Sequence, residues 1–179
     1  MITKLLTPNE WSRPKKPLES IKGLVIHWVG NPQSSANANW RYFEYRTHGT
    51  AGYGSSHYIV GLEGEVLHCI PDNEMAYHVG AKTYTDYALA KFGTYPNNCT
   101  IGIETCHLDW DGHYSTKTLE ALAKLITNLC GIYKLHPIRD VTTHHAITGK
   151  DCPKFFVDRP IAWDWFKYAI AGKCHHQEG

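Results

Sequence analysis

Imidazole and thiol groups are concentrated in the stretch VTTHHAITGKDCP, over residues 141–153. It holds the adjacent pair His144 and His145 and, after a turn, Cys152. Imidazole nitrogen and thiolate sulfur are ligands that zinc prefers in proteins. One histidine and one cysteine do not make a site, so we expect a further ligand from His27, in the segment GLVIHWVG. Two histidines and one cysteine would leave the fourth position of zinc open, which is typical of a catalytic zinc site.

Two charged residues would complete the chemistry of such a site. Glu104 interrupts the apolar segment TIGIETC near its end, where burial would raise the pKa of the carboxyl and a nearby cation would lower it. Either environment makes it a candidate general base. Lys150 precedes Cys152 by two residues, so its ammonium group can stabilise negative charge that develops on a carbonyl oxygen. An amide is the natural substrate for these groups, although Glu104 as an exposed strand end remains the alternative.

The segments around these residues predict strands that end at the candidate site. The run IKGLVIHWV, residues 21–29, is nearly all apolar and predicts a buried strand that ends before Gly30. The β-branched residues 141–143 predict a strand directly before His144. Further expected elements are a helix over 34–48, a hairpin of strands 57–60 and 65–70, a strand over 100–106, a helix over 115–135 and a last helix from residue 158 or 160.

Length and composition limit the class of protein. A chain of 179 residues without internal repeats predicts one domain. The net charge of +1, with no long basic run, gives no support for nucleic-acid binding. The six cysteines are scattered, so we interpret them as reduced thiols and one ligand rather than a disulfide framework. No segment has the pattern of a signal peptide or a transmembrane helix, so we expect synthesis as a soluble cytoplasmic protein.

We divide the chain into three parts. Residues 1–20, with several prolines and lysines, predict an extended lead-in over the surface. Residues 21–172 are expected to form the catalytic domain, and residues 173–179 a flexible tail. The tail contains Cys174–His176, which we interpret as part of a frayed end rather than as a second metal site.

Aromatic and imidazole rings are frequent in this sequence. Twelve histidines and eleven tyrosines favour a polar surface lined by rings, such as a cleft. His78, close to Gly80 at a loop edge, is a candidate substrate contact. His57 and His68 fall in the predicted hairpin strands, where we expect half-exposed side chains.

Five segments together carry a resemblance to a known family. The segments VIHWVG, SSHYIVGLEGEV, AYHVG, TIGIE and THHAITGKDCP occur in this order between about residues 22 and 156. They resemble the zinc-dependent N-acetylmuramoyl-L-alanine amidases, a group that includes phage endolysins, autolysins and peptidoglycan recognition proteins. The resemblance implies an α/β fold in one domain, with a central mixed sheet flanked by helices and zinc at the strand ends in a surface cleft. It also implies hydrolysis of the amide between N-acetylmuramic acid and L-alanine.

The resemblance implies roles for particular residues. It implies His27, His144 and Cys152 as the ligands of one Zn²⁺ ion, with His144 rather than His145 aligned as the ligand. Glu104 matches the catalytic acid and base of the family, and the lysine two positions before the third ligand is Lys150. The histidine of the AYHVG segment, His78, falls where members often contact the substrate near the metal.

The sequence departs from the family pattern at two positions. Ala146 stands where many relatives carry an aspartate just after the ligand pair, which removes one expected support of the metal. Ser56 stands where amidases of the phage-lysozyme type carry a catalytic tyrosine, so we assign it no catalytic role. The roles of His57 and Tyr58 stay open.

Three alternatives remain beside lysis of the bacterial cell wall. The first is a cytosolic amidase that recycles soluble muropeptides, the second is a peptidoglycan-binding module without activity, and the third is a structural zinc site. Peptidoglycan is the expected partner, with no nucleic acid and no membrane, and a C-terminal wall-binding domain would be absent from this chain. We expect the protein to be made in the cytoplasm and to act on the wall after release.

Overall fold

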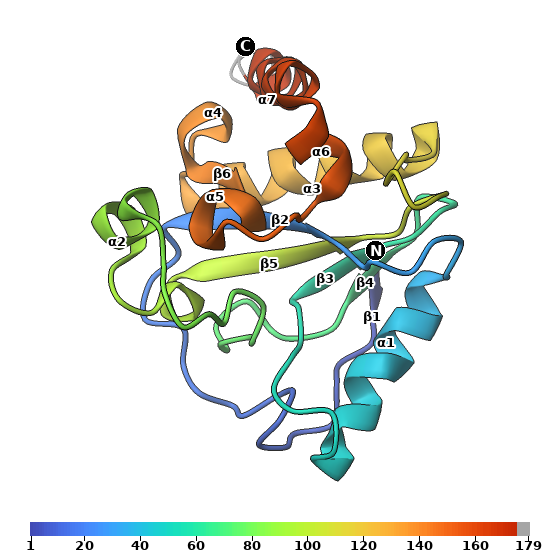
Figure 1. Ribbon diagram of the computed structural model, residues 1–179, viewed down its shortest axis with the longest axis vertical. Coiled ribbons are helices and arrows are strands. Elements are labelled where there is room, and N and C mark those ends of the chain that lie inside the picture. The colour runs from blue at the N-terminus through green and yellow to red at the C-terminus, as the bar shows by residue number, and fades with distance from the viewer. Residues whose placement is uncertain (175–179) are drawn as a thin grey trace.

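A computed structural model describes residues 1–174 of the protein. The chain has an α/β fold built on one sheet (Figure 1). Its strands are β1 (Ile2–Thr3), β2 (Gly23–Trp28), β3 (Tyr58–Val60), β4 (Val66–His68), β5 (Thr100–Thr105) and β6 (Val141–Thr143). The six strands lie in the order β1-β4-β3-β5-β2-β6. Only β3 and β4 pair antiparallel, so the sheet is mixed, as the family resemblance implied.

Helices cover both faces of this sheet. They are α1 (Ala36–Tyr45), η1 (Arg46–His48), α2 (Asp86–Phe92), η2 (Pro96–Asn98), α3 (Thr116–Tyr133), α4 (Pro137–Asp140), α5 (His144–Thr148), α6 (Lys154–Asp158) and α7 (Pro160–Cys174). Serine caps start two of the predicted helices: the hydroxyls of Ser35 and Ser115 accept from backbone N–H groups of α1 and α3. None of the described helices combines the length and the apolar character that a membrane span needs.

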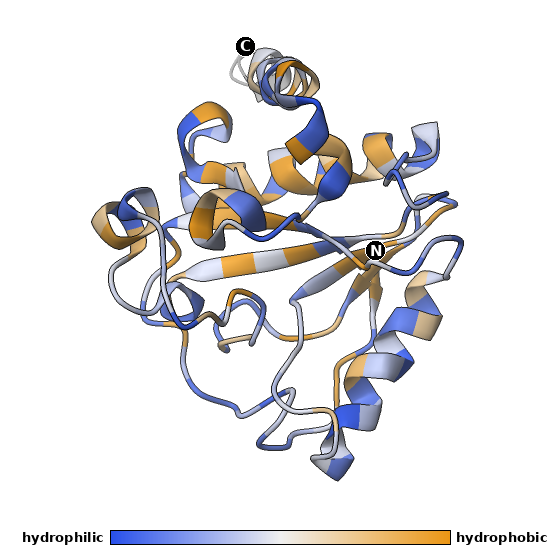
Figure 2. Ribbon diagram, in the orientation of Figure 1, coloured by the Kyte–Doolittle hydropathy of each residue, from blue (hydrophilic) through white to orange (hydrophobic). Residues whose placement is uncertain are grey.

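The central strand β2 has two different faces. Leu24 and Ile26 pack in the larger hydrophobic cluster, which includes residues of α3, whereas Val25 belongs to a cluster on the opposite face. His27 follows the same alternation as Val25, because successive side chains of a strand point to opposite faces. In Figure 2, hydrophobic residues in orange alternate along β5 with residues in paler colours or blue.

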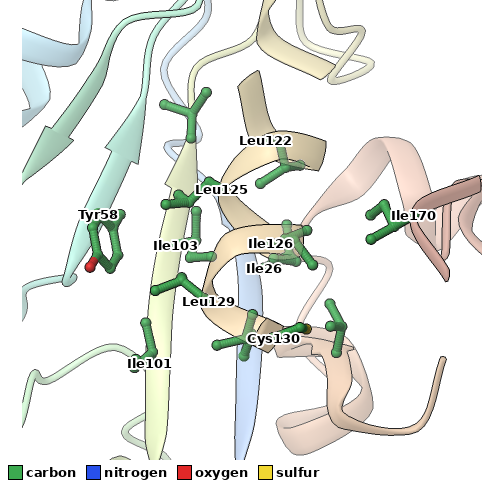
Figure 3. Packing of buried hydrophobic residues seen from close by; sticks show 13 residues of the cluster. Ile26, Tyr58, Ile101, Ile103, Leu122, Leu125, Ile126, Leu129, Cys130 and Ile170 are labelled. Carbon is green, nitrogen blue, oxygen red and sulfur yellow. The ribbon is translucent and has the colours of Figure 1, made fainter. Parts of the chain in front are cut away.

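The larger cluster lies between the sheet and the helices α3 and α7 (Figure 3). Its buried residues are Leu24, Ile26, Tyr58, Val60, Ile101, Ile103, Leu122, Leu125, Ile126, Leu129, Cys130, Val141 and Ile170. Each fully buried leucine or isoleucine contributes about 1.5–3 kcal/mol relative to an exposed one. Apolar packing on this side of the sheet therefore holds the strands in place, and the candidate site lies on the opposite face.

The opposite face is covered only in part. Helix α1 packs through Ala36 and Phe43 at the β3–β4 end of the sheet, and α2 packs through Ala88 and Phe92 near β2. Figure 1 shows α1 on one side of the sheet and α3 and α7 on the other. Residues of α1 and the ends of β2 and β5 line a cleft on this face, with Trp28 from β2 and Glu104 from β5.

Most of the predicted elements are present, with three corrections. The lead-in contains a short edge strand, β1, which pairs in parallel with β4, and short helices α4 and α6 occupy segments for which we predicted no helix or strand. His57 is fully buried, not half-exposed. Burial of this ring is possible because its two nitrogens contact a backbone carbonyl and a backbone N–H group. Helix α7 extends to Cys174, into the segment predicted as a tail, and residues 175–179 lie outside the described part.

A partly buried polar network joins the β3–β4 hairpin to α3. Asp72 accepts hydrogen bonds from the hydroxyls of Tyr58 and Tyr133, each at 2.6 Å, and lies 3.2 Å from Nε2 of His68. Burial by itself would raise the pKa of the Asp72 carboxyl, but the contacts with His68 and the two tyrosines bring that pKa below its ordinary value. The network therefore favours the charged carboxylate.

We expect Asp72→Asn to lower the free energy of unfolding by about 1–3 kcal/mol at pH 7, because one tyrosine then faces an amide N–H₂ group instead of an acceptor. The pKa of Asp72 is lower in the folded than in the unfolded protein, where it is about 4. The stabilisation is therefore present above that value and is lost as the pH falls through the folded value. Urea unfolding at a series of pH values measures it.

Asp164→Asn on the exposed part of α7 is the control for this prediction, because that carboxylate is 61% exposed. It should change the free energy of unfolding little at any pH. An Asp72 variant as stable as the wild type, or a loss of the same size at acidic and neutral pH, would contradict the role of the network.

Candidate metal centre and cleft

Three side chains from distant parts of the sequence meet at one end of the sheet. The Nδ1 atom of His27 lies 3.0 Å from Nδ1 of His144 and 3.8 Å from Sγ of Cys152. The three ligand atoms lie within 4.8 Å of one another, and all three residues are buried. We call these residues the ligand group, which has the residue types and the geometry to hold a metal ion. His145 is exposed and does not belong to this group.

Parallel strand pairing brings the ligand group together. In the register of β2 and β6, Ile26 is opposite Thr143, so His27 and His144 follow side by side. On the other side of β2, His27 is opposite Glu104 of β5. The carboxyl ends of adjacent parallel strands share one edge of a sheet, where ligand sites of open α/β sheets generally lie.

A short helix and a tight loop bring the cysteine to the histidines. Thr143 caps α5 with its hydroxyl, so that His144 becomes the first residue of the helix rather than the last of a strand. Gly149 ends α5 at φ +78°, a conformation that glycine adopts without strain. The loop then closes through a hydrogen bond of 2.8 Å from the N–H of His145 to the carbonyl of Cys152.

Burial determines the charge of the ligand group. It lowers the pKa of His27 well below the ordinary value and that of His144 to about 4. Both imidazoles are therefore neutral at pH 7, as metal ligands must be. Burial also raises the pKa of the Cys152 thiol, and a cation held by this sulfur would favour its thiolate form. Two neutral imidazoles and one thiol fit a divalent cation of borderline or soft character.

Glu104 and Lys150 both line the cleft, together with His144. Burial raises the pKa of the Glu104 carboxyl to about 8, and Lys150 acts in the opposite direction. The Oε2 atom of Glu104 is buried and has no hydrogen-bond partner among the described residues. A carboxyl with a free oxygen and a pKa near neutrality is suited to exchange a proton with a bound reactant.

His78 packs directly against His27. Its Nδ1 lies 3.0 Å from Nε2 of His27, and its own Nε2 lies 3.2 Å from the carbonyl and 3.1 Å from the hydroxyl of Thr100. Gly102 leaves the space for this ring, since a Cβ there would lie 2.5 Å from Cγ of His78. His78 also lines the cleft but is only 8% exposed. A direct substrate contact by His78 stays a prediction.

The cleft has a volume of about 1070 Å³. Four tyrosines line it, Tyr42, Tyr53, Tyr77 and Tyr95, in agreement with the predicted ring-lined surface. One wall comes from the lead-in, which contributes most of residues 8–16, including Lys15 and Lys16. The lead-in therefore does more than cover the surface, because it shapes the site.

Long-range contacts hold this wall in place. The Arg13 guanidinium donates to both carboxylate oxygens of Glu74, at 2.8 and 2.9 Å. The carbonyl of Lys16 accepts from the N–H of Met75 at 2.8 Å. Lys15 adopts a φ of +56°, a left-handed conformation that is uncommon for residues other than glycine. The backbone of both lysines is therefore fixed, while their side chains are exposed.

A second set of residues with metal-binding types lies in an exposed loop. It consists of Asp109, Asp111 and His113. The Asp109 carboxylate already accepts from the backbone N–H groups of Asp111 and His113, and it contacts the His113 imidazole at 2.8 Å. These internal contacts account for the arrangement, so we assign no ligand to it.

Two supports of the site were not predicted from the sequence. One is Thr100, the partner of His78, and the other is Asn97, whose Oδ1 accepts from the N–H groups of His78 at 3.1 Å and Val79 at 3.0 Å. Asn97 lies in the turn segment before the predicted strand over 100–106, and Thr100 is the first residue of that strand. Polar residues next to an apolar strand are a weak sequence signal for hydrogen-bond partners of site residues, because the partner of each becomes known only from the structure.

Comparison with known proteins gives a family match over most of the chain. The sequence model of the N-acetylmuramoyl-L-alanine amidase family matches residues 17–155. A probable N-acetylmuramoyl-L-alanine amidase of Bacillus licheniformis is 32% identical over 153 residues, which cover 86% of this chain and 42% of that protein. The amidase BlyA of Bacillus subtilis (strain 168) is 32% identical over 171 residues, 92% of this chain and 45% of that protein. The chain therefore spans less than half the length of these relatives.

Solved structures show the same fold. A mutant endolysin from Bacillus subtilis has a TM-score of 0.71 and 25% sequence identity, with 94% of this chain and 97% of that one covered. The solution structure of the PlyG catalytic domain has a TM-score of 0.74 at 20% identity, with 97% of this chain and 94% of that one covered. The second likeness is one of fold alone.

We expect Gly102→Ala to weaken metal binding and to destabilise the fold by about 1–3 kcal/mol, because the new methyl group overlaps the buried ring of His78. The ring must move, and its contact with His27 is then lost or lengthened. Isothermal titration calorimetry measures the metal affinity, and urea unfolding measures the stability. Gly131→Ala in α3 is the control, since a Cβ there has no heavy atom within 4 Å. Unchanged metal affinity in the Gly102 variant would contradict the importance of this packing.

Proposed function

Because the chain belongs to the N-acetylmuramoyl-L-alanine amidase family, we propose that it hydrolyses the amide bond between N-acetylmuramic acid and L-alanine in bacterial peptidoglycan. The observation that carries the proposal is the convergence of the ligand group with Glu104 and Lys150 at one cleft. Amide hydrolysis needs an activated water, a polarised carbonyl and a proton donor for the leaving nitrogen, and this set of groups can supply all three.

Zinc is the metal that we propose for the ligand group. With bonds of about 2.0–2.1 Å to nitrogen and 2.3 Å to sulfur, tetrahedral zinc separates two nitrogens by roughly 3.3 Å and a nitrogen from a sulfur by roughly 3.6 Å. The distances of 3.0 Å from His27 to His144 and 3.8 Å from His27 to Cys152 are close to these values. Zinc held there would supply a Lewis acid that polarises the scissile carbonyl and makes water more acidic.

Glu104 would hold and move the proton. As a carboxylate it accepts a proton from the attacking water, and as a carboxylic acid it passes that proton to the leaving nitrogen of L-alanine. A pKa of about 8 gives access to both forms near neutrality, and a nearby cation would lower it further toward the carboxylate. Lys150 would direct its ammonium group to the carbonyl oxygen as negative charge develops there.

The cleft fits an extended, anionic substrate. Its wall carries Lys15 and Lys16, which form no ion pair among the described residues, and its other cations include Lys150. The carboxylates that line the cleft are Glu10 and Glu104. The peptide that follows the scissile amide in peptidoglycan carries carboxylates, so lysines along the wall favour its binding. We propose that this substrate is the intact wall, reached after release of the enzyme.

Hydrolysis of isolated cell walls tests the proposed function. We expect zinc-loaded protein to release new amino termini of L-alanine and to lower the turbidity of a wall suspension. His27→Ala, His144→Ala and Cys152→Ser should each lose zinc, measured by mass spectrometry of the metal, and activity with it. Binding to walls without hydrolysis would reject the proposed activity and indicate a peptidoglycan-binding module. Activity on soluble muropeptides alone would overturn the proposed action on intact walls.

Glu104→Gln should retain zinc and lower kcat by about 10²-fold or more, because the side-chain amide of glutamine cannot take up and release a proton at neutral pH. Lys150→Ala should lower kcat by about 10²-fold if it stabilises negative charge on the carbonyl oxygen. Glu120→Gln on the exposed side of α3 serves as the matched control and should leave kcat unchanged. Near-normal turnover of the Glu104 variant with bound zinc would remove that residue from the proton transfer.

The double substitution of Lys15 and Lys16 by glutamine should raise KM several-fold on a soluble muropeptide with free carboxylates and leave kcat near the wild-type value, because these side chains would bind substrate away from the reacting atoms. Amidation of the peptide carboxylates should abolish the difference. Lys124→Gln, on α3, is the control. The same KM for wild type and double variant would reject the cationic wall as a binding surface.

A further inference from the structure

We propose that Thr100 and His78 fix the tautomer of His27, so that its Nδ1 always presents a lone pair to the metal. The four groups concerned are the carbonyl of Pro96, the hydroxyl of Thr100 and the two imidazoles, joined in series by hydrogen bonds. The inference rests on the proposed metal centre and assigns His78 and Thr100 as positioning residues for it. It needs no contact between these residues and the substrate.

The series begins with the direction of the Thr100 hydroxyl. This group lies 2.7 Å from the carbonyl oxygen of Pro96, which can only accept, so the hydroxyl donates its proton there. Its oxygen then faces Nε2 of His78, at 3.1 Å, as an acceptor. The carbonyl of Thr100 itself, 3.2 Å from the same nitrogen, is a second acceptor. With two acceptors in front of it, Nε2 of His78 must carry a proton.

The proton on Nε2 of His78 decides the state of the next ring. A neutral imidazole has one N–H group, so Nδ1 of His78 is an acceptor. It lies 3.0 Å from Nε2 of His27, which must therefore donate. That leaves Nδ1 of His27 without a proton, and this is the nitrogen that lies near His144 and Cys152. The burial of both rings, 1% and 8% exposed, disfavours a charged imidazole that would break the series.

The surrounding backbone keeps His78 in the position that the series needs. Asn97 accepts from the N–H groups of His78 and Val79, which holds the backbone at the ring. Gly102 lets the ring lie against β5, because any side chain there would occupy its place. Hydrogen bonds from the second nitrogen of a metal-bound histidine orient the ring and raise its basicity, and their loss commonly costs 10–100-fold in metal affinity.

Nitrogen NMR of the metal-free protein tests the proposed tautomers directly. Long-range correlation of imidazole ¹⁵N and ring protons distinguishes a protonated from an unprotonated ring nitrogen. We expect His27 and His78 both to carry the proton on Nε2 and not on Nδ1. A Nδ1–H tautomer of either residue, or exchange between the two tautomers in His27, would overturn the proposal. Because no substrate is involved, a protein without amidase activity still gives the answer.

Zinc affinity of variants tests the consequence, by competition with a chromophoric chelator. His78→Ala should weaken binding about 10–100-fold. His78→Asn, whose Oδ1 can replace the acceptor at Nδ1, should restore most of that affinity, and Thr100→Val should weaken it less than His78→Ala, because the carbonyl acceptor remains. His48→Asn, an exposed histidine outside the cleft, is the control.

The rescue separates a positioning role from a merely structural one. Loss of a ring that only fills space would not be restored by the smaller asparagine, and thermal unfolding identifies any variant that fails to fold. Affinity of His78→Ala equal to that of the wild type, or equal weakening in the alanine and asparagine variants when both are folded, would contradict the proposal. Tight zinc binding with the expected tautomers in a protein that leaves peptidoglycan intact would reject the proposed function but not this inference.

Discussion

The parallel pairing of β5, β2 and β6 is the constraint on which the site depends. It aligns Glu104 with His27 and sets His144 beside them, although these residues are up to 117 positions apart in the sequence. A shift of one residue in either register would turn the side chains of one strand to the opposite face. The hydrophobic cluster between the sheet and α3 fixes that register, because Ile26 and Ile103 must point into it. Apolar packing on one face of the sheet thus fixes the positions of the site residues on the other face.

Buried polar groups near the ligand group are nearly all matched with partners. The rings of His57 and His78 both have hydrogen-bond partners at their two nitrogens, in one case including a backbone N–H of β5. An unpaired buried group costs about 1–3 kcal/mol, so these contacts define one arrangement of the rings. Among the described residues near this group, the exceptions are Nδ2 of Asn97 and Oε2 of Glu104. An unsatisfied carboxylate oxygen beside a cleft is what a proton-transfer residue requires.

The sequence was sufficient for those features that depend on local patterns. The apolar runs over 21–29 and 100–106 predicted the central strands, and the resemblance to the amidases predicted which of the adjacent histidines belongs to the ligand group. The wall of the cleft was beyond such reasoning, because the lead-in has no periodicity and its position depends on the contact of Arg13 with Glu74, 61 positions away. The burial of His57 depends in the same way on Gly102, 45 positions away.

X-ray absorption at the zinc edge tests most directly whether His27, His144 and Cys152 hold one zinc ion. The account predicts two nitrogen neighbours at about 2.0–2.1 Å, one sulfur at about 2.3 Å and one further light atom. The sulfur contribution should vanish in Cys152→Ser reconstituted with excess zinc. No sulfur neighbour in the wild type, more than one, or a sulfur contribution that persists in the variant would contradict the account.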